Sequence, residues 1–223
     1  MPIRIGVISD THYPERVPYL PYDELAEIFA DCDAIVHCGD IETMRVIDEL
    51  GRIAPVYAVR GDDEIDTQSL PLKRVVEIGG KRIGLHHAER PFWVEMRNKI
   101  GKKLGFYDGI DWDNVESWLL DEFKDDNVDA IIFGHFHIPY IKLVNGVFLF
   151  SSGSVFKQHI DSTRWRSRYA RHWFRRFTSR LQESYVTHKV HPATVGIVTI
   201  DEGGLMSAEH IELAPIDYTI APS

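Results

Sequence analysis

Four apolar segments of this chain each end at a short group of polar residues that contains aspartate or histidine. The segments are IRIGVI, AIVH, VYAV and IIF, and the groups that follow them are SDTH, CGD, RGDD and GHFH. Short apolar runs bounded by turn residues are typical of buried strands. Because ligands gather at the carboxyl ends of strands in open α/β sheets, we expect these polar groups to meet in the folded chain.

The segments between these runs predict an α/β fold. YDELAEIFADC (22–32) and IETMRVIDEL (41–50) carry apolar residues at helical spacing, so the chain is expected to begin as βαβαβ with parallel strands. Later segments predict a hairpin around Gly79-Gly80, a helix at WDNVESWLLDEF and a hairpin around Asn145-Gly146. TVGIVTID and LMSAEHIEL predict a closing hairpin.

Composition limits the class of protein. A length of 223 residues with 44% hydrophobic residues favours a single domain over 1–223. The net charge of −9 argues against general binding to nucleic acid or anionic membranes. Only Cys32 and Cys38 are present, which is too few for a disulfide framework and favours a cytoplasmic location. No apolar run approaches the ~20 residues of a membrane span, and the N-terminus lacks a signal-peptide core.

The residue types at the predicted strand ends indicate a metal site. The candidate donors are Asp10, His12, Asp40, Asp62, His87, His135 and His137. Imidazoles and carboxylates without a thiolate suit Mn, Fe, Co, Ni or Zn. The DTH and HFH spacings place two donors on the same side of an extended segment. Seven donors exceed what one tetrahedral ion uses, and a central carboxylate such as Asp40 could bridge two ions ~3.5–4 Å apart.

The donor motifs also occur in a familiar order: DTH at 10–12, GD at 39–40, GDDE at 61–64, LHH at 85–87 and GHFH at 134–137. This order resembles the calcineurin-like metallophosphoesterases, whose pattern is D-x-H, G-D, G-N-H-[ED], a lone H and G-H-x-H. The resemblance covers Ile5 to Gly153. It is closest to the compact bacterial and archaeal phosphodiesterases, which also have counterparts of IVHCGD and SSGS. It implies a four-layer α-β-β-α sandwich with two mixed sheets flanked by helices.

The resemblance further implies two transition-metal ions per chain. Asp10, His12, Asp40 and His137 would hold the first ion, and Asp40, Asp62, His87 and His135 the second. The implied activity is hydrolysis of a small-molecule phosphoester by a hydroxide that bridges the ions, with a phosphodiester favoured as substrate. The alternatives are a phosphomonoesterase for a nucleotide, sugar phosphate or phosphoprotein, and a protein-binding scaffold without activity, as in a retromer subunit of this fold.

The RGDDE turn departs from the family pattern at two positions. Asp62 replaces a neutral asparagine, which adds negative charge and favours monoanionic diesters or an iron-containing pair of ions. Asp63 stands where many relatives have a histidine near the leaving group, so it is a candidate catalytic residue or simply a solvated acid. Glu64 is expected to be a loop acid or to support the metal ligands.

Two further features leave alternatives open. His86 could reach the substrate, or strand alternation could turn it away; His87 is the better ligand candidate because the small residue Ala88 follows it, as in the family. A basic, aromatic insert at about 158–192 has Trp165, Tyr169, Trp173 and Phe177 at helical spacing. That helix could pack on the domain or, through 164–181, on a second subunit; it could also steer a phosphorylated substrate or lie on a membrane surface.

Overall fold

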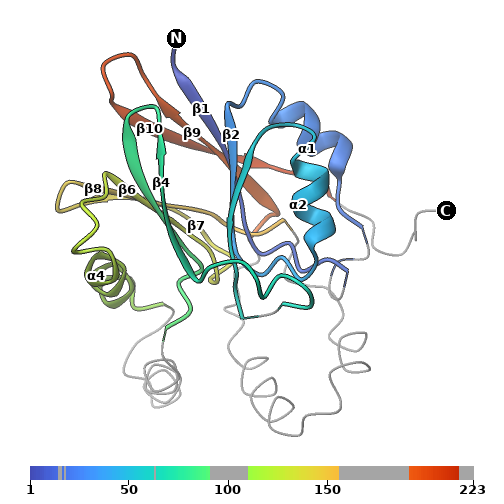
Figure 1. The fold of residues 1–223 in the computed structure, drawn as a ribbon, viewed down its shortest axis with the longest axis horizontal. Coiled ribbons are helices and arrows are strands. Elements are labelled where there is room, and N and C mark those ends of the chain that lie inside the picture. Colours follow the sequence, from blue (N-terminus) through green and yellow to red (C-terminus); the bar gives the residue numbers. More distant parts are fainter. Residues whose placement is uncertain (15–16, 18, 63, 91–109, 156–190, 216–223) are drawn as a thin grey trace, which may run out of the picture.

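Two five-stranded sheets form the centre of the computed structural model, which describes residues 1–14, 17, 19–62, 64–90, 110–155 and 191–215 (Figure 1). The first sheet has the order β10-β9-β1-β2-β3 and the second the order β4-β5-β6-β8-β7. The strands of the first sheet are β1 Ile3–Ile8, β2 Ala34–Cys38, β3 Val56–Val59, β9 Thr194–Ile200 and β10 Met206–Glu212. Those of the second are β4 Lys73–Ile78, β5 Lys81–His86, β6 Ala130–Phe133, β7 Pro139–Val144 and β8 Val147–Ser152.

Both sheets are mixed, as predicted. Strands β1, β2 and β3 run parallel, and β9 and β10 continue the first sheet in antiparallel pairs. In the second sheet β5, β6 and β8 are parallel, and β4 and β7 are antiparallel edge strands. The expected βαβαβ start and the three expected hairpins are therefore confirmed.

The described helices flank the sheets. Helices α1 (Tyr22–Ile28) and α2 (Met44–Leu50) lie beside the first sheet, and α4 (Trp112–Glu122) lies on the opposite side of the molecule (Figure 1). Helices α1 and α2 are shorter than the apolar patterns at 22–32 and 41–50. Helix α2 begins late because Glu42 has a φ of 71°, which is incompatible with a right-handed helix.

Three hydrophobic clusters fill the three spaces between four layers. Along β1, Ile8 packs in the cluster that also includes α1 and α2, whereas Ile5 and Val7 pack in the cluster between the sheets. Along β6, Ile132 lies between the sheets and Ile131 faces α4. This alternation, with a period of two residues, lets each strand contribute to two cores at once, and it confirms the predicted α-β-β-α sandwich.

Tight turns connect two of the hairpins, as their sequences predict. Gly79 and Gly80 between β4 and β5 have φ of 58° and 73°, and Asn145 and Gly146 between β7 and β8 have φ of 51° and 83°. Two successive positive φ values match the twist of hairpin strands, and glycine and asparagine adopt them at low cost. These turns fix the register of both hairpins.

Some predictions concern residues outside the described ranges. Asp63 and residues 156–190 belong to this group, so the catalytic role of Asp63 and the helix face at 164–181 stay predictions. Among the helices that the structure describes, none combines the length and apolar character needed to span a bilayer.

Candidate metal centre

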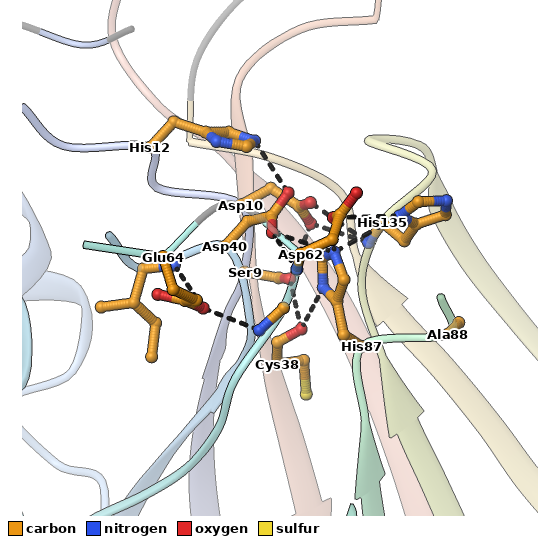
Figure 2. Close-up of polar contacts among 12 residues, drawn as sticks. Ser9, Asp10, His12, Cys38, Asp40, Asp62, Glu64, His87, Ala88 and His135 are labelled. Atoms are coloured by element: carbon orange, nitrogen blue, oxygen red, sulfur yellow. Dashed lines mark hydrogen bonds and ion pairs between the residues drawn. The ribbon is translucent and has the colours of Figure 1, made fainter. Parts of the chain in front are cut away.

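All seven predicted donors lie just past the carboxyl ends of strands, and both sheets supply them. Asp10 and His12 follow β1, Asp40 follows β2, Asp62 follows β3, His87 follows β5, and His135 and His137 follow β6. These ends converge at one edge of the sandwich (Figure 2). The expected meeting of distant sequence segments is therefore present in the fold.

The first donor group consists of Asp10, His12, Asp40 and His137, whose ligand atoms lie within 4.8 Å of one another. The Nε2 atom of His12 lies 3.2 Å from Asp40 Oδ2 and 3.3 Å from His137 Nε2. The Nε2 atom of His137 lies 3.1 Å from Asp10 Oδ1. Asp10, His12 and Asp40 are buried, so this group is largely withdrawn from solvent.

The second donor group consists of Asp62, His87 and His135. The Nε2 atom of His87 lies 3.3 Å from both Asp62 Oδ1 and His135 Nδ1. It also lies 3.2 Å from Oδ1 of Asp40, whose other oxygen faces the first group. Asp40 therefore stands between the two groups with one oxygen toward each, as expected of a bridging carboxylate.

The orientation of His87 fits a metal ligand. Its Nδ1 lies 2.7 Å from the carbonyl oxygen of Cys38, which can only accept a hydrogen bond. Nδ1 therefore carries a proton, and Nε2 points toward Asp40 and Asp62, where a metal ion could take the place of its proton. Burial opposes a charge on this ring, but Asp40 and Asp62 outweigh it and raise the pKa of His87 well above its usual value. The pocket thus favours positive charge, and its nitrogen and oxygen donors suit a divalent transition metal.

The backbone is strained at most of the donors. Asp10, His12, Asp40, His135 and His137 all have positive φ, between 45° and 78°. Residues other than glycine rarely adopt this conformation, and each such residue costs on the order of 1–2 kcal/mol. Such strain concentrates at functional sites, where the surrounding structure must hold it. The backbone strain therefore marks the same residues as the donor motifs do.

Comparison with known proteins decides the family. A model of the calcineurin-like phosphoesterase superfamily domain matches residues 3–170. The chain belongs to this superfamily. Among curated proteins, it is 33% identical over 153 residues to a probable metallophosphoesterase of Methanocaldococcus jannaschii, covering 67% of each chain. It is 32% identical over 154 residues to another from Methanothermobacter thermautotrophicus, covering 67% of this chain and 76% of the relative.

Solved structures share the fold of this chain at low sequence identity. Vps29 of Entamoeba histolytica in complex with Zn²⁺ aligns with a TM-score of 0.57 and 18% identity, over 94% of this chain and 99% of that one. A structure described as a novel archaeal phosphodiesterase aligns with a TM-score of 0.52 and 18% identity, over 94% and 100%. At these identities the similarity establishes the architecture and leaves the reaction to the site itself.

In this member of the superfamily, the residues of the acidic turn after β3 make different contacts. The carboxylate of Glu64 accepts hydrogen bonds from the backbone nitrogens of Gly61 (2.7 Å) and Glu42 (2.9 Å) and from the hydroxyl of Thr67. Glu64 thereby ties the loop after β3 to the loop after β2, the structural role expected for it. Asp62 belongs to the second donor group, and its backbone nitrogen donates to Asp40 Oδ1 at 3.0 Å.

Two donor carboxylates are held in the ionised form. Burial would raise the pKa of Asp10, but His137 and His87 lower it to about 2. Burial also opposes the charge of Asp62, and hydrogen bonds and charge interactions with His87 and His135 hold its pKa far below the usual value. Both side chains therefore remain anionic throughout the physiological range and available to a cation.

The side chain of His86 points into the layer beneath α4. It is 7% exposed, and its ring lies edge-on to Trp118 and Phe123 at centroid distances of 5.1 and 6.5 Å. Its Nδ1 accepts a hydrogen bond from the backbone nitrogen of Ala88 at 2.8 Å. These contacts describe a residue that shapes the loop carrying His87, and the predicted catalytic contact of His86 stays a prediction.

His37, expected to be structural, is buried with Nε2 3.2 Å from the Thr11 hydroxyl.

Replacing His86 with phenylalanine should reduce the pH dependence of folding stability. Burial, with help from His87 and Lys73, lowers the pKa of His86 to about 4 in the folded state. The unfolded chain, with a pKa near ~6.5, binds this proton first as pH falls, so the folded state loses up to about 3 kcal/mol between pH ~6.5 and ~4. Urea unfolding of metal-free protein at several pH values measures this loss. A His86→Phe variant with the same pH dependence as the parent would contradict the assignment.

One acid close to the centre, Glu42, belongs to none of the family motifs. Glu42 lies two residues beyond Asp40, is 1% exposed and places Oε1 3.5 Å from Nδ1 of His12. The helix predicted at 41–50 would have placed Glu42 in its first turn, where acids are common. The sequence signal that could have identified Glu42 is the spacing G-D-x-E. It places a second carboxylate, beside that of Asp40, in the loop after β2.

Proposed function

We propose that this chain is a metal-dependent phosphoesterase that prefers small-molecule phosphodiesters. The observation that carries the proposal is the pair of donor groups joined by Asp40, with one carboxylate oxygen directed to each. Two cations bound at these groups would supply Lewis acidity and a water nucleophile at neutral pH. Mn, Fe, Co, Ni and Zn all accept these donors. The two free cysteines are consistent with a cytoplasmic setting.

The chain's own residues would then set the charge that the substrate meets. Asp10, Asp40 and Asp62 contribute three negative charges, so two divalent ions would leave a formal charge of +1 where an asparagine at 62 would leave +2. The side chain of Asp62 is 41% exposed, whereas those of Asp10 and Asp40 are buried. It therefore lies on the side of the centre that an incoming substrate can reach. Lower positive charge favours the monoanionic diester over the dianionic monoester.

Replacing Asp62 with asparagine should shift the preference toward monoesters. One unit of charge ~4 Å from the phosphoryl group contributes from about 1 kcal/mol in bulk water to about 4 kcal/mol near a protein surface. We therefore expect the ratio of monoesterase to diesterase kcat/KM to rise by at least about fivefold. The measurement uses an aryl phosphomonoester and an aryl phosphodiester, with each metal added separately to stripped protein.

The control is Asp66→Asn, which makes the same change in the same loop. Asp66 accepts a hydrogen bond from the backbone nitrogen of Met44 at 2.7 Å and belongs to neither donor group. It should leave the ratio unchanged. If Asp62→Asn leaves the ratio of monoesterase to diesterase kcat/KM unaltered, the charge argument for a diester substrate fails. If the parent protein hydrolyses monoesters faster than diesters, the proposed preference is wrong.

A further inference from the structure

The two nitrogens of the His12 ring face different partners. Nε2 points toward Asp40 and His137 in the first donor group, and Nδ1 lies 3.5 Å from Oε1 of Glu42. The side chains of His12 and Glu42 are 0% and 1% exposed. A carboxylate therefore stands behind the imidazole, on the side away from the metal position.

We infer that Glu42 is a positioning residue for His12 and that it makes the first donor group the tighter metal position. The inference rests on the proposed function only in requiring that the centre binds metal. It adds a ranking of the two donor groups, which no family motif provides.

The physical argument concerns the tautomer and basicity of His12. A carboxylate facing Nδ1 favours the tautomer with the proton on that atom, which leaves the Nε2 lone pair for the metal ion. The same negative charge makes Nε2 a stronger donor. Because both side chains are withdrawn from water, solvent and salt screen the interaction little.

The second donor group differs in what stands behind His87. The partner of His87 Nδ1 is the neutral carbonyl of Cys38 at 2.7 Å, whereas Nδ1 of His12 faces a charged carboxylate at the longer distance of 3.5 Å. In addition, Asp62 is exposed, whereas Asp10 in the first group is fully buried. A more exposed donor meets more competition from water. Both differences favour the first group as the position of higher affinity.

The backbone holds Glu42 in this place. Its nitrogen donates to Glu64 at 2.9 Å, and its carbonyl oxygen accepts hydrogen bonds from the nitrogens of Ile65 (2.8 Å) and Asp66 (3.1 Å). Its φ of 71° costs free energy that an arbitrary loop residue would avoid. The loop after β3, with Glu64 at its centre, thus indirectly orients His12.

Calorimetric titration of stripped protein with Co²⁺ alone tests the inference. The parent should bind in two classes of different affinity. Glu42→Gln should weaken the tighter class by roughly 10- to 100-fold, the range for loss of an outer partner of a metal ligand, and leave the weaker class unchanged. The absorption spectrum of the first Co²⁺ equivalent should change, while that of the second should not. In a His12→Gln background, Glu42→Gln should add little further loss, because its effect passes through His12.

The control is Glu49→Gln, which changes an acid on α2 that pairs with Arg52 and should leave both classes unaltered. Equal weakening of both classes, weakening of the weaker class alone, or no change would each overturn the inference. If Glu42→Gln does not fold, Glu42→Asp keeps the charge at a shorter reach, and its loss must again fall on the tighter class. A parent protein that binds no Co²⁺ would instead refute the proposed function.

Discussion

Replacing Asp40 with asparagine is expected to weaken both metal positions and to abolish hydrolysis. Its two carboxylate oxygens lie 3.2 Å from His12 Nε2 and from His87 Nε2, one in each donor group. An amide can offer one oxygen, and its nitrogen would face the other group as a poor ligand. The loss of affinity should exceed the ~10–100-fold typical of outer partners. Metal content after dialysis, together with assays of an aryl phosphodiester and an aryl phosphomonoester, checks this.

The metal positions that lose affinity distinguish a substitution of Asp40 from a substitution of another donor. Asp10→Asn should reduce binding mainly at the first group, because Asp40 is the carboxylate that directs an oxygen to each group. Asp66→Asn again serves as the control that alters neither. Full retention of metal by Asp40→Asn would show that Asp40 does not bridge the groups.

Replacing Gly134 with alanine is expected to be nearly as damaging, although glycine offers no ligand. A Cβ atom there would overlap the hydroxyl of Ser9 and lie 2.7 Å from the Cys38 carbonyl oxygen and 2.9 Å from Asp10 Oδ2. These neighbours are backbone or buried, so the loop carrying His135 must move. We expect loss of metal binding and a fall in unfolding free energy of about 2 kcal/mol or more.

The matched control for this glycine lies in the turn between β9 and β10. A Cβ atom at Gly203 would lie 3.3 Å from its nearest neighbour, Asp201 Oδ1, and the φ of Gly203 is not positive. Gly203→Ala should leave metal content intact and change stability by only about 0.5 kcal/mol. Equal effects of the two substitutions would mean that the close approach at Gly134 is not specific to the centre.

Much of this architecture could be predicted because its signals are local. The Gly79-Gly80 and Asn145-Gly146 pairs specify tight turns by their own conformational preferences, and the apolar runs specify strands by their period. The donors followed from those strand ends, since a chain that turns at the edge of a sheet places its polar residues there. The first group, which includes Asp10 and His137, thus assembled from segments more than a hundred residues apart.

What could not be predicted depends on tertiary contacts. The helix pattern at 41–50 is amphipathic through its whole length, yet Glu42 is removed from the helix by hydrogen bonds to Glu64, Ile65 and Asp66 on another loop. The sequence favoured His87 as the ligand, but it left the place of His86 open, and the packing of α4 shows that His86 lies beneath that helix. The positions of these side chains depend on contacts between elements, so sequence spacing does not predict them.

The two sheets contribute unequal but essential shares of one donor set. Asp10, His12, Asp40 and Asp62 come from the first sheet, and His87, His135 and His137 from the second. A bound cation would therefore act as a cross-link between the sheets at the open edge of the sandwich. An ion present at ~100 times its dissociation constant adds about 2.7 kcal/mol to the stability of the folded chain. When metal is scarce, the chain would then lose folding stability as well as activity. The lifetime of the protein would therefore depend on the metal supply around it.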